Sequence, residues 1–514
     1  MRNKIFISIL ITLIFVIPIF CESDSSKRDT GIEVRKMAVQ GQFYPATATV
    51  LESLVHTFLN NAKLVIPPDG DIRAIIVPHA GYPYSGGVAS WSYRQLEGRK
   101  YKRIILIGQS HHVDGSGVSV NEVDAYATPL GNIPVDVEFV KKLKESSPFI
   151  QTDPRAHISE HSLEVQLPFL KIVLKDFKIV PILLETYNPL VSQELAQKLH
   201  TLNNGENVLY VISTDLSHYP TYQNAKTIDK KTIDLIRDMD MNEMFKHIIK
   251  EEDRDRGKVS TVMCGKGAVF TAIYLAGMEG WSNPIVLNSA NSGDVSSEKN
   301  RVVGYTAMAF VAPKNIKEES LTPKQKKKLL DLARKTIGYY FEHKDIYPYN
   351  PEDPAFKRPG SVFVTLKEQG KLRGCVGSLV AISPLYCSVQ ENALKSAFED
   401  YRFKNLSKEE LPLCEIEISV LTPLNKVNGP EDIILGKHGI RVEKNGKSAV
   451  YLPQVAPEQN WDIETTLTEL SRKANLPSDA WKEGTTFYTF EAIVFSESET
   501  DLKPKSSDNK RYTY

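Results

Sequence analysis

The length, composition and charge of this chain exclude several classes of protein. It has 514 residues, and because a typical domain has roughly 100 to 200, two to four folded units are expected. Lysine plus arginine and aspartate plus glutamate both number 63, so the overall charge gives no case for nucleic-acid binding. A hydrophobic fraction of 41% with 25% charged residues excludes a mostly disordered or multi-span membrane chain. Five scattered cysteines exclude a disulfide scaffold.

Residues 1–21 have the layout of a signal peptide or a lipoprotein-like anchor. Arg2 and Lys4 precede an apolar run over residues 5–20, and the chain turns polar from Glu22 onward. The run is short for a membrane helix, which needs about 20 residues. Cys21 stands where a bacterial lipoprotein carries its lipidated cysteine. Lipid anchoring, an uncleaved membrane anchor and ordinary cleavage remain open. An exported or lipid-anchored protein of the cell envelope is expected, and a cytoplasmic one if this segment is misinterpreted.

Residues 35–313 alternate short apolar runs with amphipathic stretches. Strands are predicted at residues 74–77, 104–107, 179–184, 208–212 and 302–309. Helices are predicted at residues 50–60, 140–144, 162–174, 191–202 and 227–248. This alternation predicts an α/β domain whose strands are continuously apolar and buried.

A short linker and a second domain are predicted to follow. Residues 314–322 are rich in lysine and glutamate and offer little to bury, and Thr322 with Pro323 then forms an N-cap and first-turn pair for a helix. Strands are predicted at residues 361–366, 372–376, 415–421 and 487–494. Residues 323–496 are therefore predicted to form an α+β domain, followed by a polar, disordered tail over residues 497–514.

Polar side chains follow three of the predicted strands in the first region. His79 follows the first strand, His111 and His112 follow the second, and Asp215 and His218 follow the fourth. Ligands of open α/β sheets bind outside the carboxyl ends of the strands, so these side chains are expected to meet in one crevice. Histidine is the commonest metal ligand and transfers protons near neutral pH. A single histidine is more often structural, but the joint placement predicts a site.

Two other stretches of this region contain reactive side chains with more than one interpretation. Cys264 alone is more typical of a buried thiol than of a metal ligand. Glu160 and Glu164 lie one helical turn apart with His161 between them, which suits the support of a metal ligand or a capped helix start equally.

Six ordered motifs in this region together resemble the Memo family: GQFYP (41–45), PHAGY (78–82), SHH (110–112), EHSLEVQLP (160–168), DLSH (215–218) and ANSGD (290–294). The resemblance implies the fold of class III extradiol dioxygenases, whose members bind iron(II). It also implies a metal site of two histidines and a cysteine, which fall on His79, His111 and Cys264. His218 takes the position of the acid/base histidine, with Asp215 beside it as its orienting residue.

The implied ligand set leaves the reaction open. A thiolate in place of a carboxylate softens the site, so copper is accepted as well as iron(II), and the thiolate can itself be oxidised. His112, Glu160 and His161 are expected to contact the substrate or to support the ligands.

Four motifs of the second region resemble the AMMECR domain: GSVFVTL (360–366), LRGCVG (372–377), AFEDYRF (397–403) and LPQV (452–455). A hairpin across residues 368–370 would place Arg373 and Cys375 on one face of the sheet. Arg373, next to a glycine, is suited to hold an anionic group. Cys375 is more typical of a small residue in a crowded strand than of a functional thiol.

The two resemblances together imply a radical SAM partner, as in the AmmeMemoRadiSam system, with the AMMECR domain recognising the substrate or partner. The sequence contains no CxxxCxxC motif, so radical SAM chemistry would have to come from that partner. The leading hypothesis is a metal-binding, redox-active enzyme with an unknown small-molecule or macromolecular substrate and a membrane contact through the N-terminal anchor. The alternative is a non-catalytic, envelope-anchored binding or scaffold protein. A metal-dependent hydrolase is disfavoured because the bridging carboxylates of two-metal sites are lacking.

Overall fold

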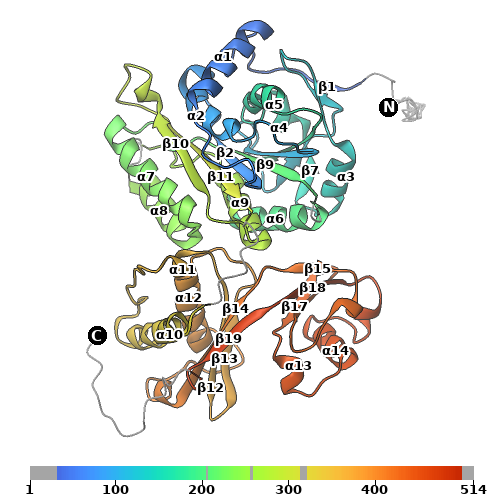
Figure 1. The fold of residues 1–514 in the computed structure, drawn as a ribbon, viewed down its shortest axis with the longest axis vertical. Helices are drawn as coiled ribbons and strands as arrows, with labels where there is room; N and C mark the ends of the chain where they lie inside the picture. Colours follow the sequence, from blue (N-terminus) through green and yellow to red (C-terminus); the bar gives the residue numbers. More distant parts are fainter. Residues whose placement is uncertain (1–31, 204–205, 255–258, 313–320, 500–514) are drawn as a thin grey trace, which may run out of the picture.

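The computed structural model describes residues 32–203, 206–254, 259–312 and 321–499. The predicted leader, most of the predicted linker and most of the predicted tail lie outside these residues. Within them, no helix is long and apolar enough to cross a membrane. The described chain forms a first region, coloured blue to yellow, and a second region, coloured orange to red (Figure 1).

An eight-stranded sheet forms the centre of the first region, in the order β10-β11-β2-β9-β3-β8-β4-β7. Its middle is a parallel group of almost entirely buried strands: β2 (Ile72–Val77), β9 (Val208–Ser213), β3 (Arg103–Gln109) and β8 (Lys178–Leu184). Burial on both faces requires continuously apolar strands, so the α/β prediction is confirmed.

Shorter or antiparallel strands extend this sheet on both sides. On one side lie β11 (Gly304–Val311) and β10 (Ile285–Asn291), and on the other β4 (Val118–Val120) and β7 (Ile150–Thr152). A small separate sheet contains β1 (Val34–Arg35), β5 (Ala125–Tyr126) and β6 (Ile133–Pro134).

Helices pack around this sheet (Figure 1): α1 (Ala48–Asn61), α2 (Tyr82–Arg94), α3 (Val137–Glu145), α4 (Pro154–Ile158), α5 (Leu167–Val173), α6 (Pro189–Asn203), α7 (Tyr222–Asp238), α8 (Met241–Arg254) and α9 (Lys266–Glu279). The helix predicted at residues 227–248 is two helices, because Met239 adopts a left-handed conformation with φ of 52° and ends α7. The helix predicted at residues 162–174 begins as a 3-10 turn at Glu164–Gln166 before α5.

The second region has the α+β character expected from the sequence. Its first helix, α10 (Pro323–His343), starts at the predicted cap, where Thr322 and Gln325 form a capping box. One antiparallel sheet contains β13 (Lys371–Gly377), β12 (Ser361–Glu368), β14 (Cys414–Leu421) and β19 (Ala492–Ser496), and is packed against α10 and α12 (Leu385–Phe398). The other contains β15 (Asn425–Val427), β18 (Thr486–Phe490), β16 (Gly439–Lys444) and β17 (Lys447–Tyr451). Short helices α11 (Pro354–Lys357), α13 (Val455–Glu458) and α14 (Ile463–Lys473) complete it.

Three details of the second region differ from the expectations. The strand predicted at residues 487–494 is two strands, β18 and β19, which belong to different sheets. The predicted hairpin forms, with positive φ at Gln369 and Gly370, but a register shift at Arg373 interrupts the simple alternation of faces. Glu497, expected in the polar tail, is buried and accepts a hydrogen bond of 2.6 Å from Nε of Arg334. A charge-assisted contact therefore holds the start of that segment against α10.

The two regions touch at the end of α9 that is remote from the strand ends carrying the predicted site (Figure 1). α9 begins after Gly265 and ends at Gly280, whose Cα approaches Pro423 so closely that a Cβ would lie 2.8 Å from the proline ring. The backbone N–H of Met241 also donates to the carbonyl of Ile382 over 3.5 Å. A 14-residue helix is about 21 Å long, so the second region docks well away from Cys264.

Asp229 of α7 provides a pH-dependent test of this fold. Its carboxyl accepts the backbone N–H of Ser217 over 3.0 Å, and burial raises its pKa to about 7. Because the folded-state pKa lies above the unfolded value, ionisation of Asp229 destabilises the fold progressively as the pH rises from about 4 to 7. Asp229→Asn keeps an acceptor but cannot ionise. The unfolding free energy of this variant relative to the wild type should therefore increase by on the order of 4 kcal/mol between pH 4 and pH 8. Urea titrations of both proteins across this pH range measure the difference in unfolding free energy. A difference that does not change with pH would refute the raised pKa of Asp229.

Candidate metal centre

The turns that follow β2 and β3 bring His79 and His111 together with His161. The ring centroids of His79 and His111 are 5.2 Å apart, those of His79 and His161 5.4 Å, and those of His111 and His161 4.6 Å. One nitrogen of each ring lies within 4.8 Å of one nitrogen of the other two. His79 and His111 therefore lie close together, as expected. The ring of His161 lies beside both, so His161 is a third possible ligand and not only a residue that supports the other two.

The proton on the His79 ring can be assigned from its neighbours. Ser213 Oγ donates its single proton to the carbonyl of Ser162 over 2.6 Å and accepts a hydrogen bond from Gln166. Ser213 Oγ can therefore only accept from Nδ1 of His79, which lies 2.9 Å away. Nδ1 then carries the proton, and Nε2 keeps a lone pair that faces the Cys264 thiol. Burial, followed by the charges of His111 and His161, lowers the pKa of His79 well below its usual value, so the ring is neutral.

Glu160 fixes the ring of His111 in the same way. Its carboxylate lies 3.0 Å from Nδ1 of His111 and also accepts the backbone N–H of that residue over 2.7 Å. Burial alone would lower the pKa of His111, but the hydrogen bond and charge of Glu160 outweigh it and raise that pKa. Nδ1 is therefore the donor to Glu160, and Nε2 is the atom available to a metal ion.

Glu160 itself is a poor ligand, although His112, Glu160 and His161 also lie close enough to hold an ion. Besides its two bonds to His111, its carboxylate accepts the backbone N–H groups of His161 and Ser162 over 2.9 and 2.8 Å. These four hydrogen bonds use about all the lone-pair positions of a carboxylate. The donors, His111 first, bring the pKa of Glu160 below its usual value even though burial opposes this. Glu160 therefore positions His111, and exposed His112 stays outside the inner group.

Cys264 lies beside Nε2 of His79, the ring nitrogen that Ser213 does not contact. Its Sγ is 3.1 Å from Nε2 of His79 and accepts the backbone N–H of Asp215 over 3.2 Å. Burial raises the pKa of the thiol, so without a metal ion Cys264 is protonated. The turn is tight: a Cβ on Gly265 would lie 2.6 Å from the carbonyl of Ser213. Glycine is needed there to bring the thiol against the end of β9.

Asp215 and His218 follow β9 on the same edge of the sheet. Nε2 of His218 lies 4.0 Å from Oδ2 of Asp215, too far for a hydrogen bond. Asp215 instead accepts the backbone N–H of His79 over 2.7 Å. The two side chains are close but not hydrogen-bonded, so the orienting role of Asp215 toward His218 stays a prediction. Burial, followed by the charges of His111 and His161, lowers the pKa of His218 to about 4, and its buried Nε2 has no hydrogen-bond partner among the described residues.

A family model described as Memo-like protein matches residues 35–309, more than half of the 514-residue chain. The chain belongs to the Memo-like family. A second family model, AMMECR1, matches residues 330–495, so a single chain joins the two.

Curated relatives match the Memo-like region over nearly their whole length. A MEMO1 family protein of Methanobrevibacter smithii is 35% identical over 291 residues, which cover 54% of this chain and 99% of the relative. A MEMO1 family protein of Ignicoccus hospitalis is 36% identical over 292 residues, with the same coverage of 54% and 99%. A solved structure, the crystal structure of an uncharacterized protein from Pyrococcus horikoshii, also matches part of this chain. The two sequences are 34% identical, the match covers 34% of this chain and 93% of the other chain, and the TM-score is 0.34.

The motif residues of the AMMECR1 region lie apart from the Memo-like histidines. Arg373 pairs with Glu410 over 3.2 Å, so its charge is already partly balanced. The thiol of Cys375 lies 3.3 Å from the hydroxyl of Thr365 on the adjacent strand. Burial raises the pKa of this thiol, which is the behaviour of an inert rather than a nucleophilic cysteine.

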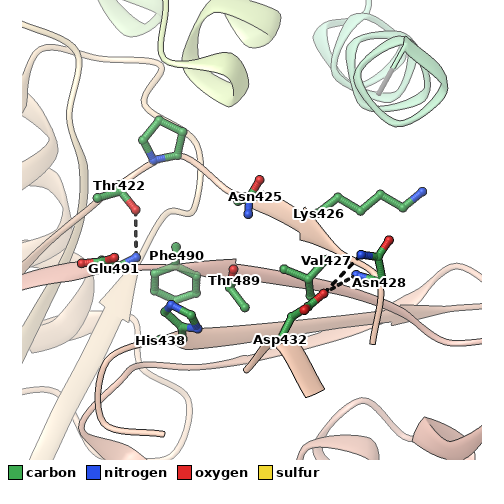
Figure 2. Close-up of a pocket in the computed structure, with 11 residues that line it drawn as sticks. Thr422, Asn425, Lys426, Val427, Asn428, Asp432, His438, Thr489, Phe490 and Glu491 are labelled. Carbon is green, nitrogen blue, oxygen red and sulfur yellow. Dashed lines mark hydrogen bonds between the residues drawn. The ribbon is translucent and has the colours of Figure 1, made fainter. Parts of the chain in front are cut away.

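A pocket of about 410 Å³ also lies in the AMMECR1 region, beside β15 and β18 (Figure 2). Several polar groups that line this pocket already form hydrogen bonds with other residues of the protein. The Thr422 hydroxyl accepts the backbone N–H of Glu491 over 2.8 Å, and Asp432 accepts that of Asn428 over 3.0 Å. No residue predicted to be functional lines this pocket, so it adds nothing to the candidate metal centre.

Proposed function

We propose that the Memo-like region is a redox-active metal centre, related to that of extradiol dioxygenases, in which His79 and His111 bind iron(II) or copper. The observation that carries the proposal is the fixed orientation of both rings. Nδ1 of His79 donates to Ser213 and Nδ1 of His111 donates to Glu160, so the Nε2 lone pairs of both rings can bind one ion. Metal-binding histidines characteristically donate their second nitrogen to such a partner.

Cys264 and His161 are the two candidates for the remaining protein ligand. The family resemblance implies Cys264, and its sulfur lies next to Nε2 of His79. The geometry adds His161, whose ring groups with those of His79 and His111. A thiolate favours copper(I) or iron, and imidazole suits both metals. Binding through Cys264 requires loss of its proton, which a coordinated cation promotes even where burial opposes it.

His218 is proposed as the acid/base residue. When bound, iron or copper would supply one-electron chemistry with dioxygen. His218 is neutral near pH 7 because burial lowers its pKa to about 4, so it can accept a proton from a substrate. Its Nε2 has no hydrogen-bond partner in the described part of the chain and is therefore available for this proton. Asp215 holds the backbone of His79 and so positions a ligand.

The AMMECR1 region is proposed to recognise the substrate or a partner rather than to complete the metal centre, because it docks at the far end of α9. The family resemblance points to a radical SAM partner, whereas the N-terminal leader points to the cell envelope. Cell fractionation separates the two: recovery with membranes supports an envelope protein, and recovery in the cytosol strengthens the partner assignment.

A comparison of turnover with metal content tests the catalytic proposal. The full chain loaded with iron(II) or copper is expected to consume dioxygen in the presence of ascorbate. His218→Ala should keep the metal but lower this rate by about 100-fold, since a positioned acid/base group typically contributes that much or more. Equal rates in the wild type and His218→Ala, with equal metal content, would instead favour a binding or scaffold protein.

A further inference from the structure

A groove of about 770 Å³ lies between α7 and α8, two helices that run side by side in the Memo-like region (Figure 1). Each helix lines the groove with residues spaced three or four positions apart, which lie on one helix face. The volume is typical of a site for a small molecule. The charged and titratable residues of its lining are Lys231 from α7 and Glu243, Lys246, His247, Lys250 and Glu251 from α8.

Two of the three lysines of the groove have no acidic partner. Lys246 pairs with Glu243 over 2.7 Å, and Glu251 has a partner of its own. Lys231 and Lys250 are exposed and form no ion pair with the residues that the structure describes. Their two positive charges, one from each helix, therefore face the groove without a counterion, which favours a negatively charged ligand.

A buried histidine contributes a hydrogen-bond acceptor to the same groove. His247 lines the groove although only 7% of its surface is exposed. The Thr232 hydroxyl donates its one proton to the carbonyl of Ile228 over 3.0 Å, so it accepts from Nε2 of His247 over 2.9 Å. Nε2 therefore carries the ring proton. Nδ1 keeps a lone pair that has no hydrogen-bond partner in the described chain and is not sealed from solvent, so it faces the groove.

The His247 ring is mostly neutral at pH 6.5 and above. Burial is the main cause of its lowered pKa. Of the charged groups that face the ring, Lys231 and Lys250 add to this effect, whereas Glu251 and Glu252 oppose it. Nδ1 therefore accepts a hydrogen bond. Sulfate has no proton to donate to it, but a phosphate monoester, whose second pKa is about 6, still keeps one proton on part of its molecules.

We propose that the groove between α7 and α8 binds the phosphate group of a small phosphate monoester. Lys231 and Lys250 bind the anionic oxygens, and the remaining P–OH group donates to Nδ1 of His247. A phosphodiester has no such proton at neutral pH, so the groove discriminates against nucleic-acid backbones and phosphodiester lipids. The site lies outside the candidate metal centre and does not depend on the proposed function.

Calorimetric titration of the metal-free full chain at pH 6.5 with methyl phosphate, dimethyl phosphate and sulfate tests this site. We expect methyl phosphate to bind with a Kd of about 1 mM, and about tenfold more tightly than the other two probes. Lysines alone would favour the sulfate dianion, so this order of affinities reports the acceptor on His247. The double variant Lys231→Gln, Lys250→Gln should bind methyl phosphate about tenfold more weakly or worse, because two charge-assisted contacts are lost.

The matched control is the double variant Lys226→Gln, Lys230→Gln, which removes the same charge from α7. Lys226 lies 4.3 Å from the centre of the Tyr222 ring, and Lys230 pairs with Asp234 over 2.8 Å. This control should bind methyl phosphate within twofold of the wild type, and far-UV circular dichroism verifies that both variants are folded.

Three results would overturn the proposal. The first is no saturable binding of methyl phosphate by the wild type. The second is an equal loss in the two double variants, which would show general attraction to a positive surface. The third is equal affinity for methyl phosphate and sulfate, which would show an adventitious ion only. All titrations are made without metal, so they leave the proposed metal centre untouched whichever result is obtained.

Discussion

Glu164→Gln is expected to lower the unfolding midpoint of the Memo-like region by about 6 °C or more, because it breaks a buried ion pair, a change that costs roughly 3–5 kcal/mol. The carboxylate of Glu164 pairs with Arg35 and accepts the backbone N–H groups of Ala38 and Val39 over 2.7 and 3.0 Å. It also accepts the hydroxyl of Tyr44 over 2.6 Å. Glutamine removes the charge and leaves the Arg35 guanidinium buried without its counterion.

The effect should extend to the metal centre, since Arg35 also donates to the carbonyls of His157 and Glu160 over 3.0 and 2.5 Å. Differential scanning calorimetry of the full chain measures the midpoint. The matched control is Glu194→Gln, which removes a partly exposed helical pair with Lys198 and should cost well under 1 kcal/mol. If the two variants unfold at the same temperature, the buried network does not hold this part of the fold.

Glu160→Gln is expected to weaken metal binding by about 10- to 100-fold, the usual effect of removing a group that orients a histidine ligand. An amide has one carbonyl oxygen in place of two carboxylate oxygens, so it cannot accept both the ring and the backbone donors of His111. The ring then loses its fixed tautomer, and its Nε2 is no longer reserved for the ion. Titration of the metal-free protein with iron(II) or copper against a competing chelator gives the affinity.

Glu194→Gln again serves as the control and should bind metal as the wild type does. Near-UV circular dichroism verifies that Glu160→Gln remains folded. A folded Glu160→Gln with an affinity within twofold of the wild type would show that Glu160 does not support a metal ligand.

Much of the fold follows from local patterns in the sequence. Continuous apolar runs bounded by polar residues identify β2, β3, β8 and β9, because both faces of these strands are covered. α9 has no such signal: it is buried on nearly all sides, so its apolar residues show no helical period. The break between α7 and α8 depends on the left-handed backbone conformation of Met239. β18 and β19 pair with different sheets because of tertiary contacts, which no local sequence pattern predicts.

The sequence predicts the part of the site that is formed by residues at the ends of strands. His79 and His111 were expected to converge and do so, but the sequence could not show which ring nitrogen each presents. That depends on Ser213 and Glu160, which lie 134 and 49 positions away in the sequence from the rings they contact. His161 was expected to support the ligands, yet its ring lies beside them, because the turn before Glu164–Gln166 points it inward. The roles of Cys264, Asp215 and His218 stay predictions.

Metal analysis of the purified full chain tests the central claim most directly. Wild-type protein loaded anaerobically with iron(II) or copper(I) and desalted is compared with the double variant His79→Ala, His111→Ala, and with His56→Ala, an exposed histidine away from the centre. We expect stoichiometric metal in the wild type and in His56→Ala, and its loss from the double variant. Equal metal content in all three proteins would contradict the proposed metal centre.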